Sequence, residues 1–385
     1  MSIFRMVVFL VVFGGLVTGV HVYLYRRLVR DPMRSARARR LGRWLFASLA
    51  ALLLGGIVVN RFLPRHLGEF VGYGAFGWMG LVTLLVPLFW AVDMVQIPWA
   101  VRRRARGDGP VDPARRLALA RGAAALTTLT AGGAAAVAVD TALAGPVVEK
   151  ITVPIKGLDP ALDGFTIAQL SDIHVGPTIG RDFVEGLVRT VNGLGVDLVA
   201  ITGDLVDGTV ARLGEHTAPL GTFESTHGTY FCTGNHEYYS GVDAWCAELE
   251  RLGITVLRNR HVSLTHGGAP LDVVGVDDWR ADHDLAKACA GRDRARFGLL
   301  LAHQPKSVHA AAEHGLDLML CGHTHGGQIW PANLVVKLIQ PYVTGLHAHT
   351  DRTWIYVNRG TGYWGPPMRL AVPAEITWLR LKRVV

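Results

Sequence analysis

The chain has 385 residues, half of them apolar, and a formal charge of +8 at pH 7. That charge is unevenly divided: residues 1–145 hold 18 arginines, no lysine and six acidic residues, whereas residues 146–385 hold 21 basic and 25 acidic residues. The basic excess belongs to the first third alone, so nucleic-acid binding by the rest of the chain is not indicated. The length allows two or three domains, and we expect a membrane part, 1–145, followed by a second domain, 146–385.

Four apolar stretches in the first part are long enough to cross a bilayer as helices, which takes roughly 20 residues. They cover about residues 3–25, 44–63, 73–101 and 122–145. The first lacks a small-residue cleavage site, so we interpret it as a retained anchor rather than a signal peptide. The fourth is rich in Ala, Gly and Thr, and a soluble helix is its alternative. The sequence therefore predicts an N-terminal α-helical transmembrane bundle of four spans.

The arginines predict the orientation of this bundle. Most of them lie at residues 26–43, between the first two spans, and at 102–121, between the last two. The positive-inside rule makes both segments cytoplasmic. Both termini then lie outside, and we expect a multi-pass protein of the cell membrane with an extracytoplasmic second domain. Asp93, inside the third apolar stretch, is interpreted as an interface residue paired with arginine.

From residue 146 onwards, short apolar runs alternate with amphipathic stretches at helical spacing. This alternation predicts an α/β domain whose sheets are buried on both faces. In such a domain, ligands gather beyond the carboxyl ends of the strands. The predicted strands are 166–170, 197–202, 229–233, 271–276, 297–302, 317–320, 354–358 and 375–381, and the predicted helices include 183–194, 242–252 and 307–314.

Five of these strands end in side chains that bind divalent metals. Asp172 and His174 are two positions apart in an extended segment and so project to the same side. A single histidine of this kind is more often structural, but five groups at matching positions indicate a metal site. Carboxylate, imidazole and amide ligands together suit Mn, Fe, Zn, Co or Ni. The groups are Asp172 with His174, Asp204, Asn235 with His236, His303, and His323 with His325.

The motifs D-x-H, GD, GNH[DE], H and GH-x-H are complete here and in order, and the sequence resembles the calcineurin-like metallophosphoesterase superfamily. Two further blocks, Gly326-Gly327-Gln328-Ile329 and Gly360 to Pro367, resemble its membrane-anchored bacterial phosphodiesterases, which are related to UDP-diacylglucosamine hydrolases. The resemblance covers about residues 146–385. It implies a four-layer α-β-β-α sandwich with two divalent metal ions at the strand ends.

Carried over by position, the resemblance assigns a role to each motif residue. His236 would face the phosphate and protonate the leaving oxygen, after attack by a hydroxide that bridges the two metals. Asp207 and Glu237 would either orient imidazoles or cap turns, and both interpretations stay open. One metal would be held by Asp172, His174 and His325, the other by Asn235, His303 and His323, with Asp204 bridging both.

The sequence thus predicts a membrane-anchored phosphohydrolase that cleaves a phosphodiester or pyrophosphate, with His236, Asn235 and Asp204 as catalytic residues. Anchoring keeps the site near the bilayer, which suggests a lipid-linked substrate. The alternatives are a phosphomonoesterase or protein phosphatase, and a membrane sensor that binds metal without catalysis.

Two further features of the second domain have open interpretations. The apolar segment 329–346 follows a ligand loop directly. One interpretation is a lip that touches either the bilayer or a lipid substrate. The other is a hydrophobic hairpin packed on the domain. Arg359 and Arg369 flank the Trp-Gly-Pro-Pro loop and are candidate phosphate contacts.

Overall fold

The computed structural model describes every residue except 1–2, 60–62, 64, 108, 110 and 385. It contains two compact units, residues 1–139 with 365–367, and residues 140–364 with 368–385. The second predicted span, 44–63, includes residues 60–62, which lie outside the described part of the chain.

The N-terminal unit is helical. Its helices are α1 (Ile3–Tyr25), α2 (Ala36–Val59), α3 (Arg65–Ala105) and α4 (Pro113–Leu143), with a π-helical turn, Arg26–Arg30, after α1. Among the described residues, two segments are long and apolar enough to cross a membrane, Leu67–Ala105 and Pro113–Leu143. The third and fourth predicted spans are therefore supported. The described residues show no further candidate span, and α1 and α2 lie at the positions of the first two predicted spans.

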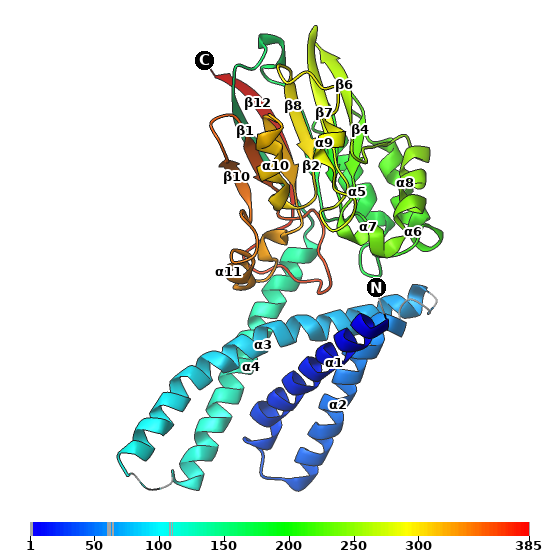
Figure 1. Cartoon of the computed structure of the whole chain (residues 1–385). Helices are drawn as coiled ribbons and strands as arrows, with labels where there is room; N and C mark the ends of the chain where they lie inside the picture. The colour runs from blue at the N-terminus through cyan, green and yellow to red at the C-terminus, as the bar shows by residue number, and fades with distance from the viewer. Residues whose placement is uncertain (1–2, 60–62, 64, 108, 110, 385) are drawn as a thin grey trace. The chain divides into compact units, whose positions relative to one another are not determined.

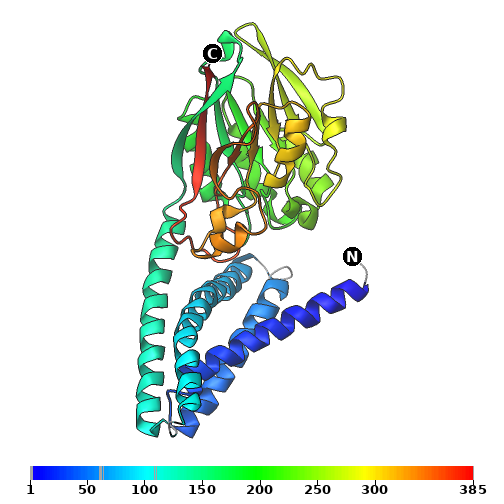
Figure 2. The same ribbon diagram turned by 60° about the vertical axis from the view of Figure 1, so that its left-hand side comes forward.

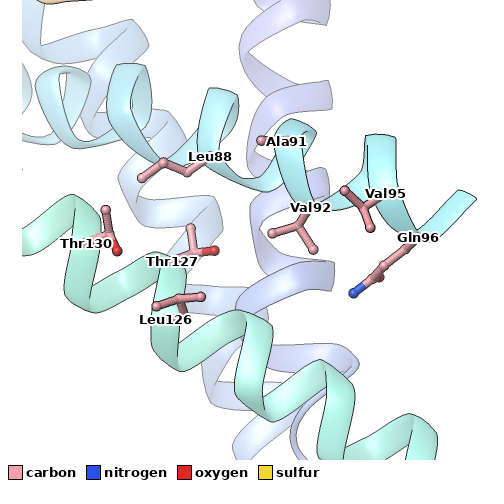
Figure 3. A pocket seen from close by; sticks show the side chains of 8 residues that line it. All are labelled: Leu88, Ala91, Val92, Val95, Gln96, Leu126, Thr127 and Thr130. Carbon is pink, nitrogen blue, oxygen red and sulfur yellow. The ribbon is translucent and has the colours of Figure 1, made fainter.

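Asp93, on α3, is bonded to two side chains that lie at the end of α1 and just after it. Its carboxylate accepts a hydrogen bond of 2.6 Å from the Tyr23 hydroxyl and lies 3.1 Å from a guanidinium nitrogen of Arg27. This is the pairing with arginine that the sequence predicted. Helices α3 and α4 also border a mostly apolar pocket of about 460 Å³ (Figure 3), lined by Leu88, Ala91, Val92, Val95, Gln96, Leu126, Thr127 and Thr130.

The second unit contains two six-stranded sheets (Figure 1). In the first sheet β2, β3, β4 and β5 are parallel, whereas β12 is antiparallel to β2 and parallel to the edge strand β1. The strands, in spatial order, are β1 (Val147–Lys156), β12 (Glu375–Val384), β2 (Thr166–Leu170), β3 (Leu198–Thr202), β4 (Thr229–Cys232) and β5 (Thr255–Val256).

The second sheet has a parallel centre and an antiparallel strand at each edge. Strands β11, β9, β8 and β7 are parallel, and β10 and β6 pair antiparallel to β11 and β7. In spatial order they are β10 (Gly345–Ala348), β11 (Trp354–Val357), β9 (Leu318–Cys321), β8 (Phe297–Leu301), β7 (Ala269–Gly275) and β6 (Arg260–His266).

Three hydrophobic cores hold these layers together, and Figures 1 and 2 show the helices outside the sheets. Residues of both sheets, such as Ile167 and Leu299, form the core between them. A second core joins the first sheet to α5 (Arg181–Asn192), α6 (Val210–Thr217) and α8 (Val242–Arg251). A third joins the second sheet to α9 (Leu285–Ala288) and α10 (Val308–Glu313). The layers therefore run helices, sheet, sheet, helices, and the predicted α/β domain with two sheets is confirmed.

The prediction missed four strands, β1, β5, β6 and β10. Strand β6 alternates between exposed and half-buried residues, and β5 has only two residues, so neither forms a continuous apolar run. The remaining short elements are α7 (Asn235–Ser240), α11 (Ala332–Val336) and 3₁₀ turns at Pro160–Leu162, Ala218–Thr222, Pro305–Ser307 and His325–Gly327.

Candidate metal centre

The predicted metal ligands meet at one edge of the second unit. They follow β2, β3 and β4 of the first sheet and β8 and β9 of the second. Because these strands are parallel within each sheet, their carboxyl ends lie at the same edge. Three groups of metal-binding atoms each lie within 4.8 Å of one another: Asp172, His174 and His325; Asp204, His303 and His323; and His174, Asp207 and His236.

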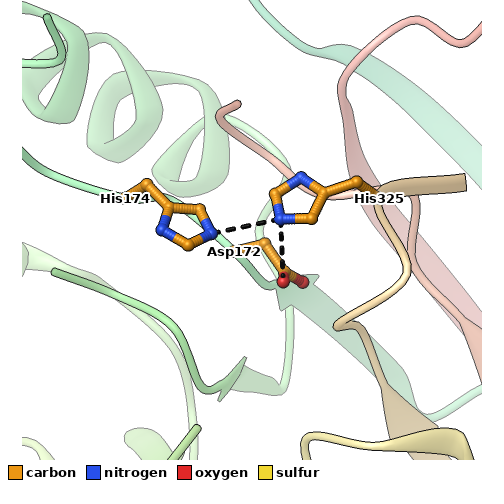
Figure 4. Close-up of side chains that lie close together, drawn as sticks. All are labelled: Asp172, His174 and His325. Atoms are coloured by element: carbon orange, nitrogen blue, oxygen red, sulfur yellow. Dashed lines mark hydrogen bonds and ion pairs between the residues drawn. The ribbon is translucent and has the colours of Figure 1, made fainter. Parts of the chain in front are cut away.

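The first group joins the end of β2 to the loop after β9. The Nε2 atoms of His174 and His325 lie 3.1 Å apart, and His325 Nε2 lies 3.3 Å from Oδ1 of Asp172. Figure 4 shows the two imidazoles facing each other with the carboxylate close to both. Asp207 accepts a hydrogen bond from His174 Nδ1 at 3.2 Å, which leaves the Nε2 lone pair directed at the centre of the group.

The second group joins the ends of β3, β8 and β9. His303 Nε2 lies 3.1 Å from Oδ2 of Asp204 and 3.2 Å from Nδ1 of His323. The other ring nitrogen of His303 donates to the Thr202 carbonyl at 2.9 Å, so the ring is fixed with Nε2 toward the site. Burial and the neighbouring His303 lower the pKa of His323 to about 4, which keeps its ring neutral and able to bind a cation.

Five of the predicted ligands have backbone conformations that residues other than glycine rarely adopt. Their φ angles are positive: 52° for Asp172, 54° for His174, 51° for Asp204, 70° for His323 and 50° for His325. Such conformations are uncommon outside glycine, cost on the order of 1–3 kcal/mol each and cluster at functional sites. The loops turn sharply here, which aims the side chains that follow β2, β3 and β9 at one region.

Two glycines leave room for the ligand carboxylates. A Cβ atom on Gly322 would lie 2.0 Å from Oδ2 of Asp172, and one on Gly234 would lie 2.2 Å from Oδ1 of Asp204. Real Cβ atoms do not approach oxygen so closely, so only glycine fits at either position. The glycines in the GH-x-H and GNH motifs therefore allow the backbone to pass against a ligand.

His236 lies beside both groups and is held by Asp207. Its Nδ1 atom donates to Oδ1 of Asp207 at 2.6 Å, and its Nε2 atom lies 3.9 Å from Oδ2 of Asp204. Burial acts to lower the pKa of His236, but the hydrogen bond to Asp207 and the charge of Asp204 outweigh it and raise the pKa to about 9. Both nitrogens of the ring are thus protonated at neutral pH.

The two interpretations left open for the loop acids apply to different residues. Asp207 orients imidazoles, because it accepts from both His174 and His236. Glu237 is fully buried and accepts the backbone N–H groups of Gly234, Asp204 and Leu205 at 2.6, 3.0 and 2.8 Å. Glu237 therefore caps the ligand turns.

The donor set fits divalent metal ions on two observations. The Oδ1 atom of Asn235 is buried and makes no hydrogen bond within the described residues, although buried polar atoms are nearly always bonded. Burial acts to lower the pKa of His303, yet Asp204 and Asp172 hold it well above its usual range. The two carboxylates thus favour a positive charge at this point, which a bound divalent cation would supply.

The two arginines considered as phosphate contacts are engaged elsewhere. Arg369 is fully buried, and its guanidinium donates to the backbone carbonyls of Arg359, Gly360, Gly362 and Val372. Arg359 forms ion pairs with Glu375 and with Glu149. Both side chains hold the loop in place, so the expectation that they bind phosphate is not met by this geometry.

Two aromatic side chains beside His236 had no role in the sequence analysis. The rings of Tyr239 and Trp364 lie 5.4 and 5.7 Å from the His236 ring, centre to centre. The backbone of Trp364 is bonded twice to the Gln328 side chain, through its N–H and its carbonyl, at 3.0 Å each. In the sequence, the only sign of a role for Trp364 was its position in a loop rich in Gly and Pro. The fold shows that its ring contacts His236.

Taken together, the two sheets and the metal-binding side chains at their carboxyl edge define an α/β domain with a candidate metal centre. Residues 165–327 match the family model described as calcineurin-like phosphoesterase. A bovine relative, named transmembrane protein with metallophosphoesterase domain, is 35% identical over 387 residues, which cover 94% of this chain and 86% of the relative. The chain therefore belongs to the calcineurin-like metallophosphoesterase family, a family of metal-dependent phosphoester hydrolases.

Two further similarities cover less of the protein. A Helicobacter pylori metallophosphoesterase is 42% identical over 246 residues, which are 62% of this chain and 65% of the relative. The chain thus spans somewhat less than two thirds of that relative's length. Among solved structures, a dimetal phosphatase from Danio rerio has a TM-score of 0.32 at 12% identity, over 52% of this chain and 88% of that one, which is too distant to inform function.

Proposed function

We propose that this chain is a membrane-anchored phosphohydrolase that uses two divalent metal ions to cleave a phosphodiester or pyrophosphate. The observation that carries the proposal is the position of Asp204. Its Oδ2 atom lies 3.1 Å from His303 Nε2 and 4.0 Å from His174 Nε2, so one carboxylate faces both groups of ligands. We assign Asp172, His174 and His325 to one ion, Asn235, His303 and His323 to the other, and Asp204 to both.

Bound there, divalent ions would supply positive charge for the phosphoryl oxygens and lower the pKa of a coordinated water. The protein's own contribution centres on His236. With Nδ1 bonded to Asp207, its Nε2–H points to the side of Asp204, where it can donate a proton to the leaving oxygen. Asn235 precedes His236 on α7 and carries the unbonded Oδ1 atom that suits a metal.

Hydrolysis of bis-p-nitrophenyl phosphate by the purified full chain tests the proposal. The protein is stripped of metal, reloaded with Mn²⁺ and compared with Asp204→Ala and His236→Ala. We expect metal-dependent turnover, and, for a diester whose basic alkyl leaving oxygen needs protonation, a fall of roughly 10²–10⁴-fold in the His236 variant, the range for a general acid. His314→Ala, just after α10, where the ring bonds the Ala310 carbonyl, is the matched control and keeps full activity.

Three outcomes contradict parts of the proposal. Faster hydrolysis of p-nitrophenyl phosphate than of the diester would indicate a phosphomonoesterase. Turnover that survives in Asp204→Ala would exclude the bridging role of that carboxylate. Two bound ions with no hydrolysis of any phosphoester would indicate a metal-binding sensor.

The membrane part of the proposal is that helices α1 to α4 cross the bilayer four times, with both termini outside. It is supported by the arginines at residues 26–43 and 102–121 and by the apolar segments Leu67–Ala105 and Pro113–Leu143. An alkaline phosphatase fused to the C-terminus would then be active, since that reporter folds only outside the cytoplasm. An inactive C-terminal fusion beside an active fusion in the 102–121 segment would reverse the proposed orientation.

A further inference from the structure

An apolar surface on the second unit has no function in the proposed chemistry. It consists of residues 330–339, termed here the apolar lip, which include helix α11. The hairpin interpretation required these side chains to pack on the domain, yet none of the residues of α11 is buried. Leu338 is 86% exposed and Ile339 is 61% exposed, and Trp330, Leu334 and Val335 are each more than half exposed.

The lip is held firmly although its apolar side chains are exposed. The Trp330 N–H donates to the Leu370 carbonyl at 3.1 Å, and beyond the lip the Thr324 hydroxyl donates to the Val343 carbonyl at 2.6 Å. Helical hydrogen bonding continues past α11, because the Gln340 N–H donates to the Val336 carbonyl. Leu334, Val335, Leu338 and Ile339 therefore lie on one face of a helical segment.

The region around the lip lacks acidic residues and carries a cation, which suits contact with a lipid headgroup layer. Residues 322–350 contain no acidic residue, whereas the whole of 146–385 contains 25. The lip carries one exposed cation, Lys337, which anionic lipids attract. Exposed apolar side chains, an aromatic residue and a cation without acids are the features of helices that lie in a membrane interface.

The chain itself brings a bilayer within reach of the lip. Helix α4, which is apolar enough to cross a membrane, ends at Leu143, and β1 begins at Val147. This connection can extend by only on the order of 10–15 Å. The second unit is thus tethered close to any membrane that α4 crosses.

The lip is also continuous with the metal centre. It begins two residues after Gln328, whose side chain holds Trp364 beside His236. Trp364 and Tyr239 are each more than half exposed. The Gln328 side chain therefore connects the start of the lip with an exposed aromatic residue beside the candidate general acid.

We propose that the apolar lip inserts into the bilayer interface and thereby presents the metal centre to phosphoesters of membrane lipids. This inference rests on the membrane anchoring in the proposed function. The occupant of the surface is the lipid bilayer, with the side chains of residues 334–339 at the boundary between headgroups and acyl chains.

Fluorescence quenching by brominated lipids tests the insertion directly. The full chain is reconstituted in vesicles of phosphatidylcholine and phosphatidylglycerol whose acyl chains carry bromine near the headgroup, and is compared with Trp330→Phe. The emission difference between the two proteins is that of Trp330. We expect it to be quenched about two-fold or more, because interfacial helices lie about 5–10 Å deep in the headgroup and acyl boundary.

Trp279→Phe is the matched control, because Trp279 is 45% exposed on the same unit and lies outside the lip. Its emission difference should be unquenched. Equal emission of Trp330 in brominated and ordinary vesicles, with the protein still in the vesicles, would overturn the proposal. So would burial of Trp330 by a second copy of the chain, seen as quenching-resistant emission in a dimer.

A second variant links insertion to substrate access. In Leu338→Asp/Ile339→Asp two exposed side chains are replaced, so the core is untouched. We expect turnover of a bilayer-embedded phospholipid diester to fall at least ten-fold, while turnover of soluble bis-p-nitrophenyl phosphate is unchanged. Equal loss on both substrates would contradict a docking role. If the wild type hydrolyses neither substrate, the proposed function fails, and the quenching result decides the inference by itself.

Discussion

The Oδ1 atom of Asp207 accepts hydrogen bonds from two imidazoles, His236 Nδ1 at 2.6 Å and His174 Nδ1 at 3.2 Å. One carboxylate oxygen thus sets the tautomer of a candidate general acid and of a candidate metal ligand. Both rings direct Nε2 toward Asp204 as a result. The neighbouring imidazoles keep the pKa of Asp207 below its usual range even though burial acts to raise it, so the carboxylate stays charged.

We expect Asp207→Asn to lower kcat by about 10–100-fold, the usual effect of losing a carboxylate partner of a functional histidine. The loss should be larger for a diester with a strongly basic alkyl leaving group than for the p-nitrophenyl diester, since only the former depends on protonation by His236. The measurement is kcat for both diesters with the full chain. An equal loss for both would show that Asp207 acts only on metal binding.

Replacing Gly322 by alanine should disrupt the first group of ligands. The added Cβ would lie 2.0 Å from Oδ2 of Asp172 and from Oγ of Ser171, so the loop must shift, with a cost of about 1–3 kcal/mol in unfolding free energy. We expect a lower Tm and less bound metal per chain by elemental analysis. Gly186→Ala is the control, because its nearest neighbouring atom is 3.9 Å away. Full metal content in Gly322→Ala would contradict this account.

Removal of metal should destabilise the second unit. The ligand loops hold five strained residues, and each group of metal-binding atoms contains a buried or half-buried carboxylate beside imidazoles. Ions that bind only the folded state add about 2.7 kcal/mol at 100 times Kd. We expect a chelator to lower the Tm of the wild type. His303→Ala should have a lower Tm than the wild type in the absence of chelator, and adding the chelator should lower its Tm by less. A chelator-independent Tm would show that no ion is bound.

Arg369→Met should affect stability rather than substrate binding. The guanidinium is buried and donates to four backbone carbonyls of residues 359–372, and each buried carbonyl left unbonded costs about 1–3 kcal/mol. We expect a clear loss of unfolding free energy in denaturant titrations, with KM of the remaining folded enzyme within two-fold of the wild type. A ten-fold rise in KM at unchanged stability would restore the phosphate-contact interpretation.

Much of the site could be predicted from sequence because the information is local. Each ligand directly follows an apolar run that forms a strand, as Asp172 follows β2 and His303 follows β8. Parallel strands bring their carboxyl ends to one edge, so a list of polar residues at strand ends is already a list of neighbours. The strands β2, β3, β4, β7, β8, β9, β11 and β12 were predicted for the same reason.

What the sequence left open depended on contacts between distant segments. Asp207 and Glu237 are both acids in ligand loops, and only the fold shows one bonded to imidazoles and the other to backbone N–H groups. From the sequence, Arg369 is a candidate phosphate contact, whereas in the structure its guanidinium donates to carbonyls of its own loop. The exposure of the apolar lip was likewise undecided, because hydrophobicity is a property of the residues, whereas burial depends on what packs against them.

The sequence by itself therefore determined the class of protein, and it predicted the candidate ligand set and a division into an arginine-rich helical part and an α/β part. The tertiary structure alone decided which polar groups share a hydrogen bond, where glycine is required and which apolar side chains stay exposed. The physical reason is range: strand periodicity and ligand spacing operate over a few residues, whereas hydrogen-bond partners and packing join residues such as Asp172 and His325, which are 153 positions apart.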